Sequence, residues 1–198
     1  MGELVLIRHG ETEWSLTGQH TSYTDLPLTT NGEEQARSLA PLLASRHVSA
    51  VFTSPMERAR QTAKLAGLDH ARVDPDLVEW DYGGYEGVTT REIHRQRPNW
   101  LLWTDGVIPG PEGHPGETPE QVGDRADRVL DRVDATFCDS DGGDVVLVAH
   151  AHFLRVLTAR RLGLPPADGA LFQLATGTVS RLGIEHGRNV LTSWNRLP

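Results

Sequence analysis

Two short runs of strongly apolar residues constrain the fold of this chain more than any other feature. Residues 4–7 read Leu-Val-Leu-Ile and residues 145–148 read Val-Val-Leu-Val. Runs without polar interruption need a buried sheet, so we expect both to be buried strands. Each run is followed closely by a histidine, His9 or His150. If the two strands are parallel neighbours, both imidazoles emerge at the sheet edge where open α/β sheets bind ligands.

The rest of the chain alternates strand-like runs with helical patterns, which is typical of βαβ units and a largely parallel sheet. We therefore expect an α/β protein that forms one domain over residues 1–198. Pro41 should kink the first helix. The helices are expected near residues 29–43, 55–66, 90–96, 118–133 and 154–162, and further strands near residues 50–52, 178–184 and 190–194.

Composition excludes several classes of protein. The chain has 198 residues and a formal net charge of −8, which argues against binding nucleic acid or an anionic membrane through a general basic surface. No apolar run is long enough to span a membrane. The single cysteine, Cys138, excludes an intramolecular disulfide and suits a reducing compartment. No targeting segment precedes the first strand, so we expect a cytoplasmic protein.

The stretch that begins at Ser54 predicts an anion site. Ser at the N-cap, Pro at the next position and Glu57 at the third are strong helix-start signals. Arg58 lies in that opening turn and can reach the sheet edge where Arg8 emerges. Helix N-termini favour anions, and arginine grips phosphate with two donors. Two arginines and two histidines therefore indicate a phosphoryl group.

His9 is the candidate nucleophile. One of its ring nitrogens must face phosphorus while a hydrogen bond holds the other, and a carbonyl near the Gly10 turn can accept that bond. His150, protonated or as a hydrogen-bond donor, can stabilise the equatorial oxygens. His150 and His152 could instead share a strand face and hold a metal. No further ligands stand at a recognisable spacing, so we predict no metal.

A leaving alkoxide also needs a proton, and the acidic stretch of residues 79–87 can supply it. Glu79 is the candidate donor and Asp81 is its local rival. Asp81 lies on the same face as Glu79 if the backbone is extended there, and one face over if it is helical. The residues alone leave that choice open.

Taken together, these residues resemble the phosphoglycerate mutase-like branch of the histidine phosphatase superfamily. The resemblance covers about residues 4 to 155. Its motifs occur in the family's order and are Arg8-His9-Gly10-Glu11-Thr12, Leu28-Thr29-x-x-Gly32-x-x-Gln35-Ala36, Ser54-Pro55-x-x-Arg58-Ala59-x-Gln61-Thr62-Ala63 and Ala149-His150. The implied fold is a three-layer α/β sandwich, phosphoglycerate mutase-like, in which a mainly parallel sheet is flanked by helices. Residues 79–116 are expected to form an excursion that covers the active site.

The resemblance also implies roles for single residues. His9 would form a phosphohistidine, Arg8, Arg58 and His150 would surround the phosphoryl group, and Glu79 would donate the proton. Further phosphate-pocket and substrate contacts are expected from Ser15, Thr21, Ser22, Tyr82 and Ala151. The family usually has Gly where Ala151 stands, and a positive φ there would strain alanine. No metal or organic cofactor is implied.

Departures from the mutase pattern favour a phosphatase. Mutases carry Asn where this chain has Ser15, and Gly-Leu-Asn-Lys where it has residues 87–90. Without that lysine, the carboxylate of a phosphoglycerate loses a partner. We therefore predict a metal-independent acid or sugar-phosphate phosphatase that acts on a small phosphorylated substrate. The alternatives are a cofactor-dependent phosphoglycerate mutase and a non-catalytic phosphate-binding module. A homodimer is also possible.

Overall fold

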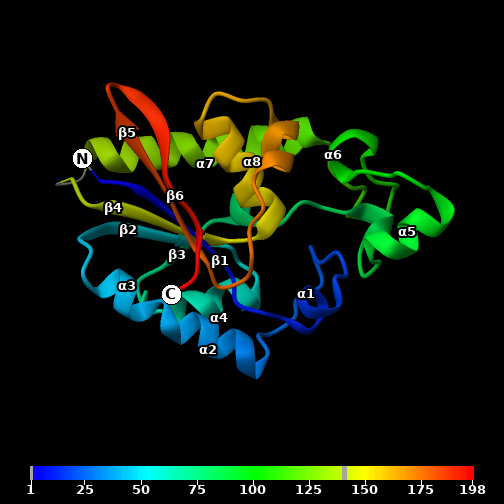
Figure 1. The fold of residues 1–198 in the computed structure, drawn as a ribbon, viewed down its shortest axis with the longest axis horizontal. Coiled ribbons are helices and arrows are strands. Elements are labelled where there is room, and N and C mark those ends of the chain that lie inside the picture. Colours follow the sequence, from blue (N-terminus) through cyan, green and yellow to red (C-terminus); the bar gives the residue numbers. More distant parts are fainter. Residues whose placement is uncertain (1, 140–141) are drawn as a thin grey trace.

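The computed structural model describes residues 2–139 and 142–198. At its centre is a six-stranded sheet in the order β3-β2-β4-β1-β5-β6 (Figure 1). The strands are β1 (Leu4–Arg8), β2 (Val48–Thr53), β3 (Arg72–Val73), β4 (Asp144–Ala149), β5 (Val179–Glu185) and β6 (Arg188–Arg196). Strands β1 to β4 are parallel to one another, and β5 and β6 close the sheet as an antiparallel hairpin. The predictions of a mainly parallel sheet and of the hairpin are confirmed.

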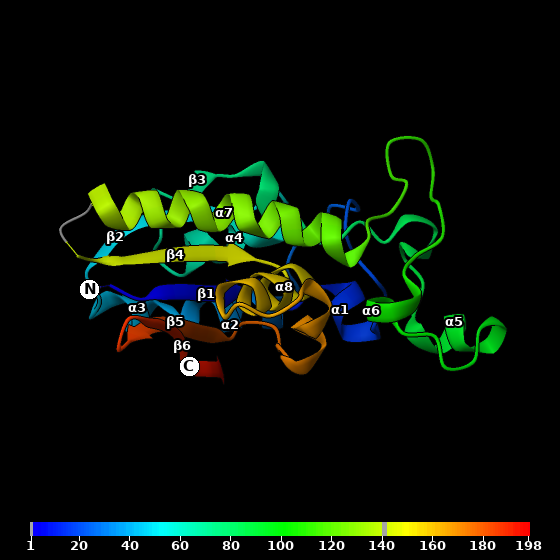
Figure 2. The ribbon, with the colours of Figure 1, turned by 90° about the horizontal axis from the view of Figure 1, so that it is seen from above.

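Helices cover both faces of this sheet, which gives three layers. They are α1 (Glu13–Thr17), α2 (Thr30–Ser38), α3 (Ala40–Ala44), α4 (Glu57–Leu65), α5 (Thr90–Gln96), α6 (Leu102–Asp105), α7 (Pro119–Asp139) and α8 (Ala151–Arg161). Helices α7 and α8 lie on one face and α2, α3 and α4 on the other (Figures 1 and 2). The predicted three-layer α/β architecture is therefore confirmed.

The apolar run of β1 is explained by these layers. Leu4 and Leu6 belong to the core cluster beneath α7 and α8, whereas Val5 and Ile7 belong to the cluster beneath α2, α3 and α4. Successive side chains of a strand point to opposite faces, so a strand between two helical layers needs an apolar residue at every position. Strand β4 is buried along its whole length in the same way.

Local signals fixed several helix ends. The helix predicted over residues 29–43 is divided at Leu39 into α2 and α3, with Pro41 in the first turn of α3. Proline has no N–H to donate, so the break falls where its ring enters. Thr118 and Gln121 cap the start of α7 reciprocally, through bonds of 2.8 and 3.3 Å to each other's backbone N–H.

The predicted start of α4 is wrong by two residues. The helix begins at Glu57 with Met56 in the N-cap position, and no side chain caps it. The hydroxyl of Ser54 instead bonds the ring of His150, at 2.8 Å. Arg58 therefore lies in the first turn of α4 as expected, although Ser54 does not cap that turn.

Residues 79–116 leave the three layers and contain α5 and α6. Figures 1 and 2 place these two helices beyond the carboxyl ends of β1 and β4. Aromatic side chains of this segment pack in the same core cluster as α7 and α8. They are the buried Trp80, Tyr82, Tyr85 and Trp100. Within the described part of the chain, no helix combines the length and the apolar character needed to cross a membrane.

Candidate active site

His9 stands at the end of β1, where Gly10 turns the chain away from the sheet. Its Nδ1 lies 2.7 Å from the carbonyl oxygen of Gly10, so Nδ1 carries the proton and Nε2 keeps its lone pair. Burial lowers the pKa of His9 well below its usual value of 6.5, and the charges of Arg58 and Arg8 lower it further. The imidazole is therefore neutral, with Nε2 available as a nucleophile.

His150 follows β4, the parallel neighbour of β1, and its ring centroid lies 5.2 Å from that of His9. Its Nδ1 lies 3.2 Å from Nε of Arg58. Because a guanidinium only donates, Nδ1 must accept, and the proton of His150 stands on Nε2, facing Ser54 Oγ. Burial and the charge of Arg58 lower the pKa of His150 well below 6.5. Of the two forms considered from the sequence, the geometry therefore favours the neutral donor.

Arg58 is fully buried and is held by a loop from another part of the chain. Its Nη1 donates to the carbonyl of Thr24 at 3.1 Å, and its Nη2 to that of Ser22 at 3.0 Å. The loop is itself fixed by Glu86, whose carboxylate accepts from the backbone N–H of Ser22 at 2.9 Å and of Thr24 at 3.0 Å. A continuous set of hydrogen bonds thus runs from Glu86 through the loop to the guanidinium.

We expect Glu86→Leu to raise KM for p-nitrophenyl phosphate by about tenfold, because the loop that orients Arg58 loses its acceptor. Glu86→Gln should restore most of the affinity, since one carboxylate oxygen, Oε1, accepts from both N–H groups and an amide oxygen can do the same. Steady-state kinetics of both variants provide the measurement. Equal KM values for Glu86→Leu and wild type would contradict this role.

Arg8 approaches the same edge from β1. Its Nη1 donates to the carbonyl of Leu174 at 2.6 Å, whereas its Nε is buried and has no hydrogen-bond partner among the described residues. Buried donors are rarely left unpaired, and exceptions call for an explanation such as a missing ligand. An anion at the site would satisfy this donor.

Glu79 reaches the site through the N-terminus of α8. Its Oε1 accepts from the backbone N–H of Trp80 at 2.9 Å and of Phe153 at 2.8 Å, and its Oε2 accepts from that of His152 at 3.1 Å. Helix α8 begins at Ala151, three residues before the predicted start, because this distant carboxylate satisfies the free N–H groups of its first turn. Oε2 accepts a single bond and has capacity for another.

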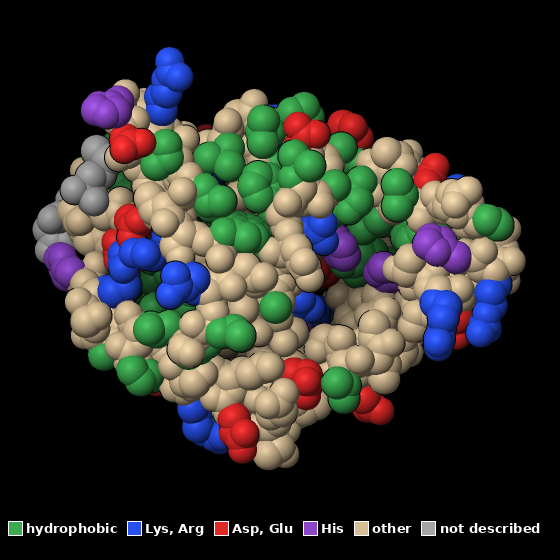
Figure 3. All heavy atoms as spheres, in the orientation of Figure 1, with side chains coloured by type: hydrophobic (Ala, Val, Ile, Leu, Met, Phe, Trp, Pro, Cys, Tyr) green, Lys and Arg blue, Asp and Glu red, His purple; other side chains and the backbone are tan. Residues whose placement is uncertain are grey.

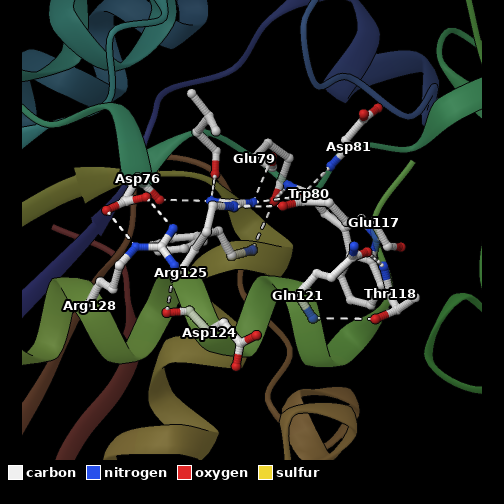
Figure 4. Close-up of polar contacts among 12 residues, drawn as sticks. Asp76, Glu79, Trp80, Asp81, Glu117, Thr118, Gln121, Asp124, Arg125 and Arg128 are labelled. Carbon is white, nitrogen blue, oxygen red and sulfur yellow. Dashed lines mark hydrogen bonds and ion pairs between the residues drawn. The ribbon is translucent and has the colours of Figure 1, made fainter. Parts of the chain in front are cut away.

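The backbone around Glu79 is held by Arg125 of α7 (Figure 4). The guanidinium donates to the carbonyls of Asp76 at 2.7 Å, Val78 at 3.0 Å and Glu79 at 3.2 Å. It also forms an ion pair with Glu117 at 2.7 Å. One buried side chain thus ties the segment that presents Glu79 to the longest helix of the fold.

Asp81, the rival of Glu79, points elsewhere. Its carboxylate accepts from the backbone N–H of Gly83 at 2.9 Å and of Gly116 at 3.1 Å. It lines a cavity of about 640 Å³ near His114, and not the cavity that contains His9. The geometry favours Glu79 as the carboxylate beside His9.

The predicted residues surround a cavity of about 270 Å³ at the sheet edge. Figure 3 shows a hollow with basic and histidine side chains on this side of the molecule. Arg58 and His150 lie fully buried behind the lining, and Ser22 lines the neighbouring 640 Å³ cavity instead. The remaining predicted residues line the 270 Å³ cavity and are Arg8, His9, Ser15, Thr21, Glu79, Tyr82 and Ala151.

The four predicted substrate contacts that line this cavity differ in the groups that they offer a ligand. The hydroxyl of Ser15 takes part in the capping box of α1, and that of Thr21 donates to the carbonyl of Gln19 at 3.1 Å. The hydroxyl of Tyr82 lies 2.6 Å from Nδ1 of His152. Ala151 is absent from the described residues with positive φ, so the strain considered for alanine there does not arise.

Several residues of this neighbourhood were not predicted to belong to the site, and Ser54 and Arg155 are the two that matter most for its chemistry. Ser54 has the sequence context of a helix cap, whereas in the structure its hydroxyl bonds His150. Arg155 lines the 270 Å³ cavity from α8, and nothing in its local sequence distinguishes it from the other arginines of that helix. Over residues 2–139 and 142–198, no three His, Cys, Asp or Glu side chains are grouped to hold a metal ion.

The comparisons with known proteins identify the family. Residues 4–197 match the model of the histidine phosphatase superfamily (branch 1), and the chain belongs to this family. An acid phosphatase of Mycobacterium tuberculosis is 41% identical over 93% of this chain and 87% of the relative. The sedoheptulose 1,7-bisphosphatase of Saccharomyces cerevisiae is 37% identical over 81% of this chain and 67% of the relative. A solved structure of a Mycobacterium tuberculosis open reading frame has a TM-score of 0.88 and 40% identity, covering 99% of this chain and 98% of that chain.

Proposed function

We propose that this protein hydrolyses small phosphate monoesters by transferring the phosphoryl group to Nε2 of His9 and then to water. The observation that carries the proposal is the state of His9, which is buried and neutral, with Nδ1–H fixed on the Gly10 carbonyl. A histidine in that state, beside two arginines without carboxylate partners in the described chain, supports nucleophilic attack on phosphorus.

The first step forms a bond between Nε2 of His9 and phosphorus and breaks the bond from phosphorus to the ester oxygen. The leaving oxygen takes a proton from Glu79, at Oε2, and departs as the alcohol. Arg8 and Arg58 are proposed to bind the equatorial oxygens, whose charge is spread in the transition state. His150 is proposed to join them by exchanging its Nε2–H from Ser54 Oγ to an equatorial oxygen. The unpaired Nε of Arg8 supports its part in this set.

In the second step, water attacks the phosphohistidine. Glu79, now ionised, accepts a proton from the water, and the bond from phosphorus to Nε2 breaks as inorganic phosphate forms. His9 returns to its neutral state and Glu79 to its protonated state, so the cycle is balanced. No step needs a metal ion or an organic cofactor.

The prediction of a phosphatase is confirmed by the family and by the phosphatases among the relatives. The test of the mechanism is release of inorganic phosphate from p-nitrophenyl phosphate in the presence of EDTA. Sustained hydrolysis is the expected result. Isomerisation of 3-phosphoglycerate, dependent on a bisphosphoglycerate and without phosphate release, would support the mutase instead, and binding without turnover would support the non-catalytic module.

The lowered pKa of His9 predicts activity in acid. Because the nucleophile is neutral above its pKa, kcat/KM should not fall as the pH drops through 6.5, the usual pKa of histidine. The profile should be measured with two monoesters whose phosphate groups ionise at different pH. A shared acid limb centred near 6.5 would contradict a buried, neutral His9.

Further aspects of the proposal rest on the sequence pattern. We place the enzyme in the cytoplasm, on the evidence of its single cysteine. We also propose that the chain is one domain, in which residues 79–116 cover the site. The substrate is a small phosphorylated molecule, and a homodimer stays a prediction that light scattering can test.

A further inference from the structure

Arg155 is a third arginine at the active-site cavity. It lies on α8, five residues after His150, and lines the same 270 Å³ space as Arg8 and His9. The lining continues from His9 at the sheet edge to Thr90 of α5. A ligand held at His9 can therefore extend towards a second cation.

The guanidinium of Arg155 is held in place by neutral groups. Its Nε donates to the carbonyl of Gly169 at 3.0 Å, and its Nη2 to that of Ala170 at 3.2 Å. Its central carbon lies 4.6 Å from the centroid of the Trp103 ring. Two carbonyls and an aromatic face fix the plane of the group without neutralising its charge.

No carboxylate of the described residues forms an ion pair with Arg155, although the negative charge of Glu79 partly offsets the effect of burial on its pKa. Two other arginines of α8 have carboxylate partners, since Arg160 pairs with Asp127 and Arg161 with Asp134. For Arg155, neither an ion pair nor a hydrogen bond from Nη1 is found over residues 2–139 and 142–198. Burial lowers its pKa, which indicates that its charge is partly desolvated. A partly buried cation without a partner is costly, and an anion would offset that cost.

With Glu79 protonated, as the proposed first step requires, the positive charges at the cavity exceed what one phosphoryl group requires. Arg8 and Arg155 line it and Arg58 lies behind it, whereas Glu79 is the one carboxylate of its described lining. A phosphate monoester carries about two negative charges, which Arg8 and Arg58 can match. We propose that Arg155 binds a second anionic group of the substrate, a phosphate or a carboxylate separated from the transferred phosphoryl group by a short carbon chain.

This inference rests on the proposed function and names its substrate class. The preferred substrates are phosphorylated sugars or acids that carry two anionic groups. The missing lysine of the mutase pattern does not exclude them, because Arg155 supplies a cation from a different element.

The test uses two matched pairs of substrates. Glycerol 3-phosphate and 3-phosphoglycerate differ by a carboxylate, and fructose 6-phosphate and fructose 1,6-bisphosphate differ by a phosphate. We expect wild type to prefer the second member of at least one pair. In Arg155→Gln, kcat/KM for that member should fall by about 10²-fold, mainly through KM, and by much more than for its partner. The pair that responds identifies the anion as carboxylate or phosphate.

Arg161→Gln is the matched control, since it removes an arginine of the same helix that pairs with Asp134. Its preference ratio should equal that of wild type. Equal losses on both members of each pair in Arg155→Gln would place Arg155 on the transferred phosphoryl group and overturn the inference. Unchanged ratios in Arg155→Gln would also overturn it.

Titration calorimetry of the same four substrates with His9→Asn repeats the comparison without turnover. The double variant His9→Asn, Arg155→Gln then shows how much of the binding preference depends on Arg155. If wild type hydrolyses no monoester but binding shows the Arg155-dependent preference, the proposed function fails and the inference stands. If hydrolysis occurs without that preference, the inference fails and the proposed function stands.

Discussion

Replacement of His9 by asparagine is expected to lower kcat for p-nitrophenyl phosphate by at least about 10⁴-fold, as loss of a covalent nucleophile does in other enzymes. Asparagine removes the ring nitrogen that attacks phosphorus, although its amide can still donate to the Gly10 carbonyl that now accepts from Nδ1. Arg8, Arg58 and His150 remain, so the variant should still bind phosphate. Activity and binding are thereby separated.

The control for His9→Asn is His186→Asn in the turn between β5 and β6. His186 has a φ of 50°, a conformation that asparagine also adopts readily, so this variant should match wild type in kcat. Wild type quenched in alkali during turnover should carry one phosphoryl group on the peptide that contains His9. Full activity of His9→Asn, or a phosphoryl group on another residue, would refute the nucleophile.

The sequence predicted the parts of the site that local patterns determine. The apolar runs before His9 and His150 predict buried strands, and their carboxyl ends meet at one edge if the strands are parallel neighbours, as the structure shows them to be. The Gly10 carbonyl is adjacent in the chain to the ring that it holds, so it too could be predicted. These inferences need only the chain itself and the period of a strand.

The features that the sequence predicted wrongly or not at all depend on contacts with residues far away along the chain. Ser54 has the sequence of a helix cap, but its hydroxyl bonds His150, which lies 96 residues away. Helix α8 starts early because Glu79, 73 residues before His152, satisfies its first turn. Arg155 differs from Arg160 and Arg161 only in what packs around it. No local pattern records such contacts, so they follow from the fold alone.

The motif residues without a chemical role join distant segments around the Gly10 turn. Thr62 Oγ1 accepts from the backbone N–H of Gly10 at 3.0 Å and donates to the carbonyl of Arg58 at 2.7 Å. Gln35 accepts from the backbone N–H of Glu11 at 2.9 Å. The position of His9 therefore depends on how closely α2 and α4 approach this turn.

Gly10→Ala should consequently impair both stability and catalysis. A Cβ at Gly10 would lie 2.3 Å from the carbonyl oxygen of Gly32 in α2, a backbone atom that cannot rotate away. We expect a loss of about 3 kcal/mol in the free energy of unfolding, which corresponds to a drop of roughly 10 °C in Tm. Displacement of the Gly10 carbonyl should also turn the His9 ring and lower kcat by about 10²-fold.

Gly67→Ala provides the matched control, because Gly67 has a φ of 78° and nothing lies within 4 Å of an added Cβ. Its cost should be that of a left-handed alanine alone, about 1 to 2 kcal/mol, with kcat unchanged. Calorimetry and kinetics of the two variants separate backbone strain from steric exclusion. If Gly10→Ala were no less stable than Gly67→Ala and retained full kcat, contact between the β1 turn and α2 could not be what holds His9 in its attacking position.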